Sequence, residues 1–125
     1  MQVIHPQAVH KDDRGEITDL LQREQINAIT LITFTKGAVR ANHCHKQTVQ
    51  WNYVISGKIK LVTQMPGDKI VETMLKKGDM AVTRENERHA LQGLEDSCLM
   101  VFTRGPRGGD EYETDTFRLE EPLIK

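Results

Sequence analysis

The amino-acid sequence predicts an all-β fold, a sandwich or closed barrel of about ten short strands. Apolar and β-branched residues recur with a period of two, and turn-forming residues interrupt them roughly every 8–12 positions. Segments with a helical period are almost absent. Many short strands leave many sheet edges, and a chain covers those edges by folding its sheets onto each other.

The expected strands follow one another along the chain, separated by turns in which Gly reaches positive φ or Pro pre-sets φ. The turn signals are Asp12–Gly15, Ser56–Gly57, Pro66–Asp68 and Lys76–Asp79. The strands are expected at Val3–Val9, Glu16–Leu21, Ala28–Phe34, Arg40–His45, Val49–Ile55, Lys58–Gln64, Lys69–Leu75, Met80–Thr83, His89–Leu94 and Ser97–Thr103. Evidence for helix is thin: a helical turn or two is expected at Leu20–Asn27, and Asp110–Glu120 is polar with only Tyr112, Phe117 and Leu119 as apolar anchors.

The chain has the length of one domain, so we expect residues 1–125 to form a single unit. Its barrel core should cover about residues 28–104. The Gly-rich stretch Gly105–Gly109 then opens a C-terminal tail, residues 105–125. Arg104 and Arg107 flank that stretch, and exposed amides beside two guanidiniums can hold an anion.

Charge and hydropathy exclude several classes of function. The 18 acidic and 17 basic residues nearly cancel, which argues against a nucleic-acid footprint. The longest apolar run, Cys98–Phe102, is too short for a membrane span or a signal-peptide core. Two cysteines are too few for a disulfide scaffold, so reduced thiols in a cytoplasmic protein are expected.

A histidine pair marks the candidate site. His43 and His45 are two residues apart in an extended segment, so both imidazoles point to the same face. Gly37 lies six residues before this pair, Gln50 five residues after it, and Gly57 seven residues further on. Gly78 is followed eleven residues later by another histidine, His89.

This pattern resembles the cupin superfamily. Its first motif, G-(x)5-H-x-H-(x)3,4-E-(x)6-G, is matched with Gln50 in place of Glu. Its second motif, G-(x)5-P-x-G-(x)2-H-(x)3-N, keeps only Gly78 and His89, since Arg84, Asn86 and Gly93 stand where Pro, Gly and Asn are expected. The resemblance implies a double-stranded β-helix (jelly-roll barrel), often a homodimer, with the motif histidines at its mouth.

Two kinds of chemistry are open at such a site. His43, His45 and His89 with the oxygen of Gln50 would suit a divalent metal such as Zn, Mn, Fe or Ni. Glu would offset one of the metal's two charges, whereas Gln offers only a dipole, so affinity should fall. A metal-free site built from the same groups is the alternative.

The metal-free alternative follows from a closer resemblance within the cupins. The stretch Arg40–Lys46 followed by Gln50 resembles the R-G-x-H-x-H-K…Q stretch of the dTDP-4-keto-6-deoxyglucose 3,4-ketoisomerases. The related dTDP-4-dehydrorhamnose 3,5-epimerases carry an upstream D-x-R-G, matched by Asp12–Gly15. Ala41 stands where the family has Gly, which leaves less room for a ligand near the backbone.

That resemblance assigns roles to individual residues. His43 or His45 would be the proton-transfer base, and Arg14 and Arg40 would hold the substrate's diphosphate. Asn52, on the same strand face as Gln50, is a further candidate for substrate binding. Imidazole titrates near neutral pH and suits removal of a proton next to a ketone, and arginine suits a diphosphate.

The predicted function is therefore an isomerase or epimerase of a nucleotide-linked 4-keto-6-deoxy sugar. A metal-dependent cupin, either an oxygenase or a small-acid isomerase or lyase, remains open, as does a non-catalytic small-molecule-binding domain. The predicted partners are a small molecule, possibly a dTDP-sugar, and a second copy of the chain, with Trp51 facing outward as an anchor of the dimer interface.

Overall fold

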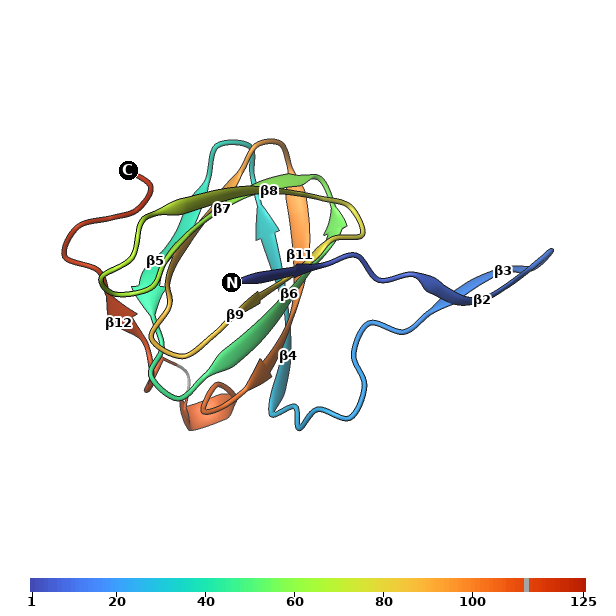
Figure 1. Ribbon diagram of the computed structural model, residues 1–125, viewed down its shortest axis with the longest axis horizontal. Coiled ribbons are helices and arrows are strands. Elements are labelled where there is room, and N and C mark those ends of the chain that lie inside the picture. The colour runs from blue at the N-terminus through green and yellow to red at the C-terminus, as the bar shows by residue number, and fades with distance from the viewer. Residues whose placement is uncertain (112) are drawn as a thin grey trace.

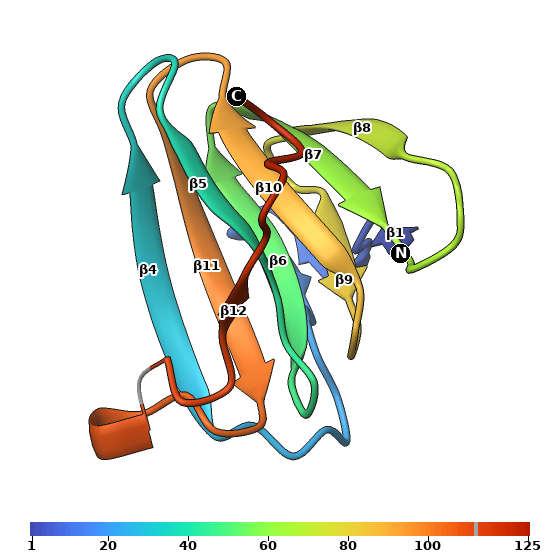
Figure 2. The same ribbon diagram turned by 90° about the vertical axis from the view of Figure 1, so that its left-hand side faces the viewer.

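Two five-stranded antiparallel sheets face each other in the computed structural model, which describes residues 1–111 and 113–125 (Figure 1). The first sheet has the order β1-β9-β6-β11-β4, formed by Gln2–Ile4, Met80–Thr83, Val49–Ser56, Ser97–Arg104 and Ala28–Phe34. The second has the order β12-β5-β10-β7-β8, formed by Phe117–Arg118, Val39–Cys44, Arg88–Gly93, Lys58–Gln64 and Val71–Lys76. Figure 2 shows the two sheets curving around a common interior, which confirms the predicted all-β jelly roll.

The core lies between the two sheets and follows from the period-two pattern. Along β11, burial alternates residue by residue, with Leu99 and Val101 inside. Val54 on β6 and Ile59 and Leu61 on β7 meet them from either side. These side chains are almost fully removed from water, so the apolar interior fixes which face of each strand points inward.

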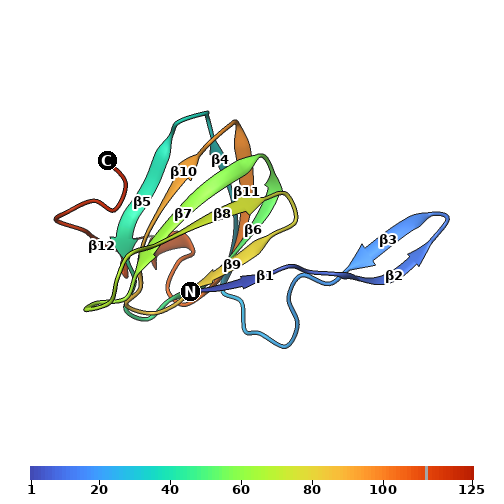
Figure 3. The ribbon, with the colours of Figure 1, turned by 45° about the horizontal axis from the view of Figure 1, so that its top comes forward.

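The N-terminal part differs from the prediction. The expected strand Val3–Val9 is divided at Pro6, and the hairpin of β2 (Ala8–Asp12) and β3 (Gly15–Thr18) projects away from the barrel as an arm (Figures 1 and 3). Proline has no N–H to donate to a strand ladder, which is a physical reason for a break there.

The segment between the arm and β4 forms no helix and instead covers the outer face of the first sheet. Its residues Leu20, Leu21 and Ile26 pack against a cluster that contains Trp51. Trp51 does point away from the barrel interior, but it is only 6% exposed. The expectation that it anchors a dimer interface is therefore wrong, because the chain's own N-terminal segment already covers it.

The described residues of the polar C-terminal segment Asp110–Glu120 form no α-helix. A 3-10 helix spans Gly109–Glu111, and the two-residue strand β12 then pairs with the edge of β5. The open edge of β5 offers unpaired backbone groups, and pairing with it outweighs the weak helical pattern of this polar segment. Tyr112, one of the few apolar anchors in that segment, lies outside the described residues.

A bulge in β5 sets the approach to the histidines. Ala41 pairs with Ala90 and His43 pairs with His89, so Asn42 is the extra residue on β5. Ala41 and Asn42 both have positive φ, at 72° and 57°. Asparagine tolerates the left-handed region better than alanine does, so the Gly expected at position 41 from the resemblance to the 3,4-ketoisomerase stretch has a backbone cause.

No helix in the described part of the chain combines the length and the apolar character that a membrane crossing requires.

Candidate metal and substrate site

The structure brings the three predicted histidines together inside the barrel. His43 and His45 come from β5 and the residue that follows it, and His89 comes from the neighbouring strand β10. One ring nitrogen from each lies within 4.8 Å of the others. The ring centroids of His43 and His89 are 4.7 Å apart, and those of His45 and His89 are 5.2 Å apart.

Hydrogen bonds to backbone carbonyls orient two of the rings. Nδ1 of His45 donates to the carbonyl of Asp115 at 2.8 Å, and Nδ1 of His89 donates to the carbonyl of Glu87 at 3.1 Å. A carbonyl oxygen can only accept, so the ring proton of each neutral histidine is on Nδ1 and Nε2 carries a lone pair. Among the described residues, Nε2 of His45 is the one buried side-chain nitrogen or oxygen without a hydrogen-bond partner.

The surroundings keep His43 and His89 uncharged. The pKa of His43 is lowered to about 3, mainly by burial and to a smaller extent by the electrostatic effects of His89, His45 and Arg118. Burial, with a smaller effect of His45, lowers the pKa of His89 to about 4. Both rings are therefore neutral at pH 7, which is the form that binds a metal. The low pKa values also make both rings weak bases.

Gln50 and Asn52 lie on β6 and line the same cavity as the histidines. The Gln50 amide is half-buried, and its nitrogen lies 3.5 Å from Thr103 Oγ1. The Asn52 amide is hydrogen-bonded to the neighbouring strand β9, where its nitrogen donates to the Ala81 carbonyl at 3.0 Å. Gln50 can therefore offer its oxygen to a bound cation, while Asn52 acts mainly as part of the scaffold.

The cavity has a volume of about 530 Å³ and a cationic rim. Arg40, Arg107 and Arg118 line it, against Glu113 as the one carboxylate among the described lining residues. Arg40 also donates to the Thr33 carbonyl at 3.2 Å, which fixes it beside β4. Because guanidinium groups bind carboxylate and phosphate oxygens in pairs, this excess of positive charge suits an anionic ligand.

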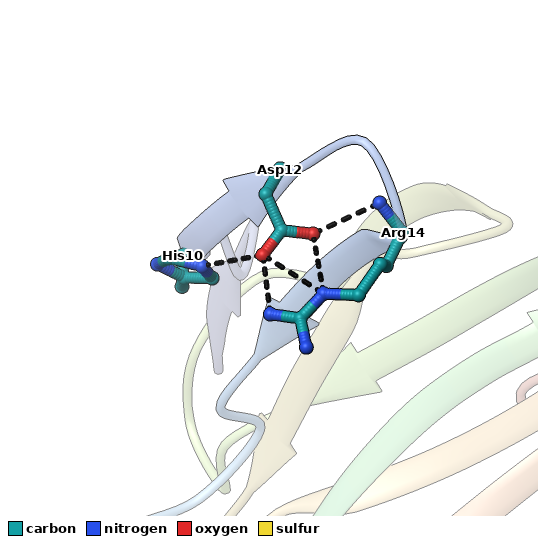
Figure 4. A network of polar contacts seen from close by, with 3 residues as sticks. All are labelled: His10, Asp12 and Arg14. Carbon is teal, nitrogen blue, oxygen red and sulfur yellow. Dashed lines mark hydrogen bonds and ion pairs between the residues drawn. The ribbon is translucent and has the colours of Figure 1, made fainter.

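Arg14, the other predicted substrate-binding arginine, is not brought to this cavity. It lies near the tip of the arm, where its guanidinium binds the Asp12 carboxylate at 2.6 Å and His10 reaches the same carboxylate at 3.0 Å (Figure 4). The Arg14 bond, followed by the bond from His10, lowers the pKa of Asp12 to about 2. Within one chain this network is separate from the histidines.

The C-terminal tail supplies the site residues that the sequence did not reveal. Arg118, Thr116 and Glu113 line the cavity, and the carbonyl of Asp115 orients His45. The segment 115–118 reads Asp, Thr, Phe and Arg, with one apolar residue among polar ones, so it shows no strand period.

Solved structures with a similar fold include several sugar-nucleotide enzymes. A TDP-quinovose 3,4-ketoisomerase from Campylobacter jejuni superposes with a TM-score of 0.79 at 18% identity, over 94% of this chain and 92% of that chain. A sugar 3,4-ketoisomerase from Thermoanaerobacterium thermosaccharolyticum, in complex with TDP, gives 0.78 at 20% identity over 95% and 88%. A dTDP-4-dehydrorhamnose 3,5-epimerase from Sulfolobus tokodaii gives 0.72 at 21% over 86% and 71%. At these identities the likeness establishes the fold alone.

A curated relative and a family model add sequence similarity. The pectin degradation protein KdgF of Dickeya dadantii (strain 3937) is 32% identical over 79 residues, which cover 63% of this chain and 67% of the relative. The cupin domain model matches residues 30–103, from within β4 to within β11, and includes all three histidines. The chain therefore belongs to the cupin domain family.

Proposed function

We propose that this cupin is an enzyme that holds a divalent cation on His43, His45 and His89 and isomerises a small anionic sugar derivative next to a carbonyl group. The observation that carries the proposal is the buried, unpartnered Nε2 of His45 beside the other two imidazoles. A buried lone pair without a donor is costly, and a cation shared with two more imidazoles would satisfy it.

The donor set fits such a cation. Three neutral imidazoles with an amide oxygen from Gln50 suit Zn, Mn, Fe or Ni. The lowered pKa values of His43 and His89 mean that neither ring has to lose a proton at neutral pH. When bound, the cation would polarise the carbonyl oxygen of the substrate and stabilise the enolate that forms after proton removal.

The chain's own residues would bind and orient the substrate. Arg40, Arg107 and Arg118 present donors to an anionic group at the rim, so the carbonyl end of the substrate is directed inward toward the histidines. When the three imidazoles hold the cation, they cannot act as the base. Glu113, the one carboxylate among the described lining residues, would then accept the proton that is removed from the substrate. Glu113→Gln should then lower kcat strongly while the affinity for the substrate changes little.

A second candidate is the metal-free isomerase or epimerase of a nucleotide-linked 4-keto-6-deoxy sugar, with His43 as the proton-transfer base. The fold neighbours, one of them holding TDP, and the arginine-lined rim favour it. His43 is the most exposed of the three imidazoles and can reach a ligand in the cavity. However, no Phe, Tyr or Trp is among the described lining residues, so that part of the cavity wall offers no aromatic stacking surface for a nucleobase.

A ligand titration discriminates between the two candidates. Tag-free protein is treated with EDTA, reloaded or not with Mn²⁺ or Zn²⁺, and titrated with TDP or with galacturonate, a carboxylated sugar. Galacturonate binding that needs the cation supports the first candidate, and TDP binding in EDTA supports the second. Loss of binding in Arg118→Gln but not in Lys77→Gln, an exposed cation away from the cavity, locates the ligand. Binding of neither ligand contradicts both.

We further propose that the chain forms a homodimer through its arm. A two-stranded hairpin is marginal without packing, and Val9 and Ile17 are 61% and 58% exposed on it. Arg14 could contact a substrate only if the arm meets the cavity of a second copy. Val9→Asp with Ile17→Asp should convert a dimer to a monomer in sedimentation experiments, whereas the control Met74→Asp on β8 should not. A monomeric wild-type protein would refute the proposal.

A further inference from the structure

We propose that Asp115 is a positioning residue that selects the tautomer of His45. It belongs to residues 113–124, here termed the strap, which lie outside the segment matched by the cupin model. The strap runs beside β5 and across the outer side of the second sheet (Figure 2). The consequence for cation binding rests on the proposed function, whereas the tautomer itself is a property of the metal-free protein.

The backbone of Asp115 acts directly on the ring. Its carbonyl oxygen lies 2.8 Å from His45 Nδ1, and both residues are buried, at 5% and 6% exposure. In solution the two neutral tautomers of histidine interconvert, but a buried acceptor at Nδ1 favours the one with the proton on that nitrogen. The lone pair is then on Nε2, the buried ring nitrogen of His45 that has no hydrogen-bond partner.

The side chain of Asp115 holds that carbonyl in place. Its carboxylate accepts hydrogen bonds from the backbone N–H of Lys46 at 3.0 Å, the backbone N–H of Gln47 at 2.8 Å and the Thr48 hydroxyl at 2.7 Å. These donors belong to the three residues that directly follow His45. Asp115 is thus hydrogen-bonded to four consecutive residues, His45 to Thr48. These bonds hold its carbonyl oxygen at a fixed position relative to the His45 ring.

The far end of the strap is fastened independently. The Asn42 amide nitrogen donates to the Ile124 carbonyl at 2.9 Å, and its oxygen accepts from the Leu123 backbone N–H at 2.8 Å. Ile124 is buried against Val62 and Ala90 on the outer side of the second sheet. Because Asn42 is also the bulged residue just before His43, the same residue links the end of the strap to the shape of the histidine strand.

His89 provides an internal comparison. Its Nδ1 donates to the carbonyl of Glu87, two residues away on the same chain segment, so its tautomer does not depend on the strap. A change in the strap should therefore alter the tautomer of His45 and leave the tautomer of His89 unchanged. A general loosening of the barrel would alter both.

The test is long-range ¹H–¹⁵N NMR of histidine-labelled, EDTA-treated protein. In the wild type, His45 and His89 should both carry the proton on Nδ1. In Asp115→Ala, His45 should become a mixture of tautomers while His89 keeps its proton on Nδ1, and Zn²⁺ affinity should fall about 10- to 100-fold. Asp110→Ala, an exposed carboxylate just before the strap, is the matched control and should change neither reading.

Two further results separate the possible failures. If Asp115→Ala does not fold, Asp115→Asn keeps the shape of the side chain but replaces one accepting oxygen with an NH₂ group, and it should still mix the tautomers of His45. Retention of a single Nδ1–H tautomer and of wild-type Zn²⁺ affinity in whichever of the two variants folds overturns the proposal. A wild-type protein that binds no divalent cation, with a tautomer that still depends on Asp115, contradicts the proposed function but supports the role of Asp115.

Discussion

Acid should destabilise the metal-free protein in a pH range set by its buried histidines. The folded state lowers the pKa of His43 to about 3 and that of His89 to about 4, whereas both return to about 6.5 in the unfolded chain. Between those limits the unfolded state binds more protons than the folded state, so the stabilising contribution is present above pH 6.5 and is lost as the pH falls. The carboxyl groups with lowered pKa act below about pH 4 and leave this range undisturbed.

The expected effect is large enough to measure. Each histidine takes up almost a full proton on unfolding near pH 5, so the two together lower the free energy of unfolding by about 4 kcal/mol between pH 7.5 and pH 5. In His43→Gln the loss over the same range should be about 2 kcal/mol. Urea unfolding of EDTA-treated protein, followed by the fluorescence of the one tryptophan, gives both curves. An unfolding free energy that is flat over this range, or equal slopes in the two proteins, would refute the reasoning.

The remaining predictions concern stability and can be checked by thermal unfolding. Gly57→Ala should cost about 3 kcal/mol, since its Cβ would lie 2.1 Å from Ser97 Oγ, whereas Gly67→Ala at the same φ meets open space and should cost about 1 kcal/mol; equal losses would contradict this. Ala41→Gly should stabilise by about 1 kcal/mol, or about 4 °C, by relieving its positive φ; a lower Tm would contradict it. Trp51→Ala should cost about 3–5 kcal/mol because the ring is buried within its own chain, and an unchanged Tm would show that the ring is not packed there.

The sequence could predict the barrel and the histidine cluster because both depend on spacing. Alternation of buried and exposed residues fixes the strand faces, and the strands β4 to β11 lie close to their predicted ranges. His43 and His45 share a face by the same rule, and antiparallel pairing of β5 with β10 places His89 opposite His43. Position 41 was also informative, since Ala there departs from a Gly that the backbone favours.

The strap could not be predicted because its main contact uses a backbone atom. The carbonyl that orients His45 would be present with any residue at position 115, and only the fold shows that it reaches the ring. The position of the arm could not be predicted for another reason. Arg14 was placed by a short motif, and nothing in that motif says that the hairpin leaves the barrel. Trp51 was assigned to a strand face correctly, but its cover comes from residues more than twenty positions away.

The most direct test of the metal site is elemental analysis of freshly purified, tag-free protein. About one divalent transition-metal ion per chain is expected in the wild type, with His45→Ala and His89→Ala each folded and nearly empty. A wild-type protein that contains no such ion, and takes up none when Zn²⁺, Mn²⁺, Fe²⁺ or Ni²⁺ is supplied after purification, would contradict the account of His43, His45 and His89 as a cation site.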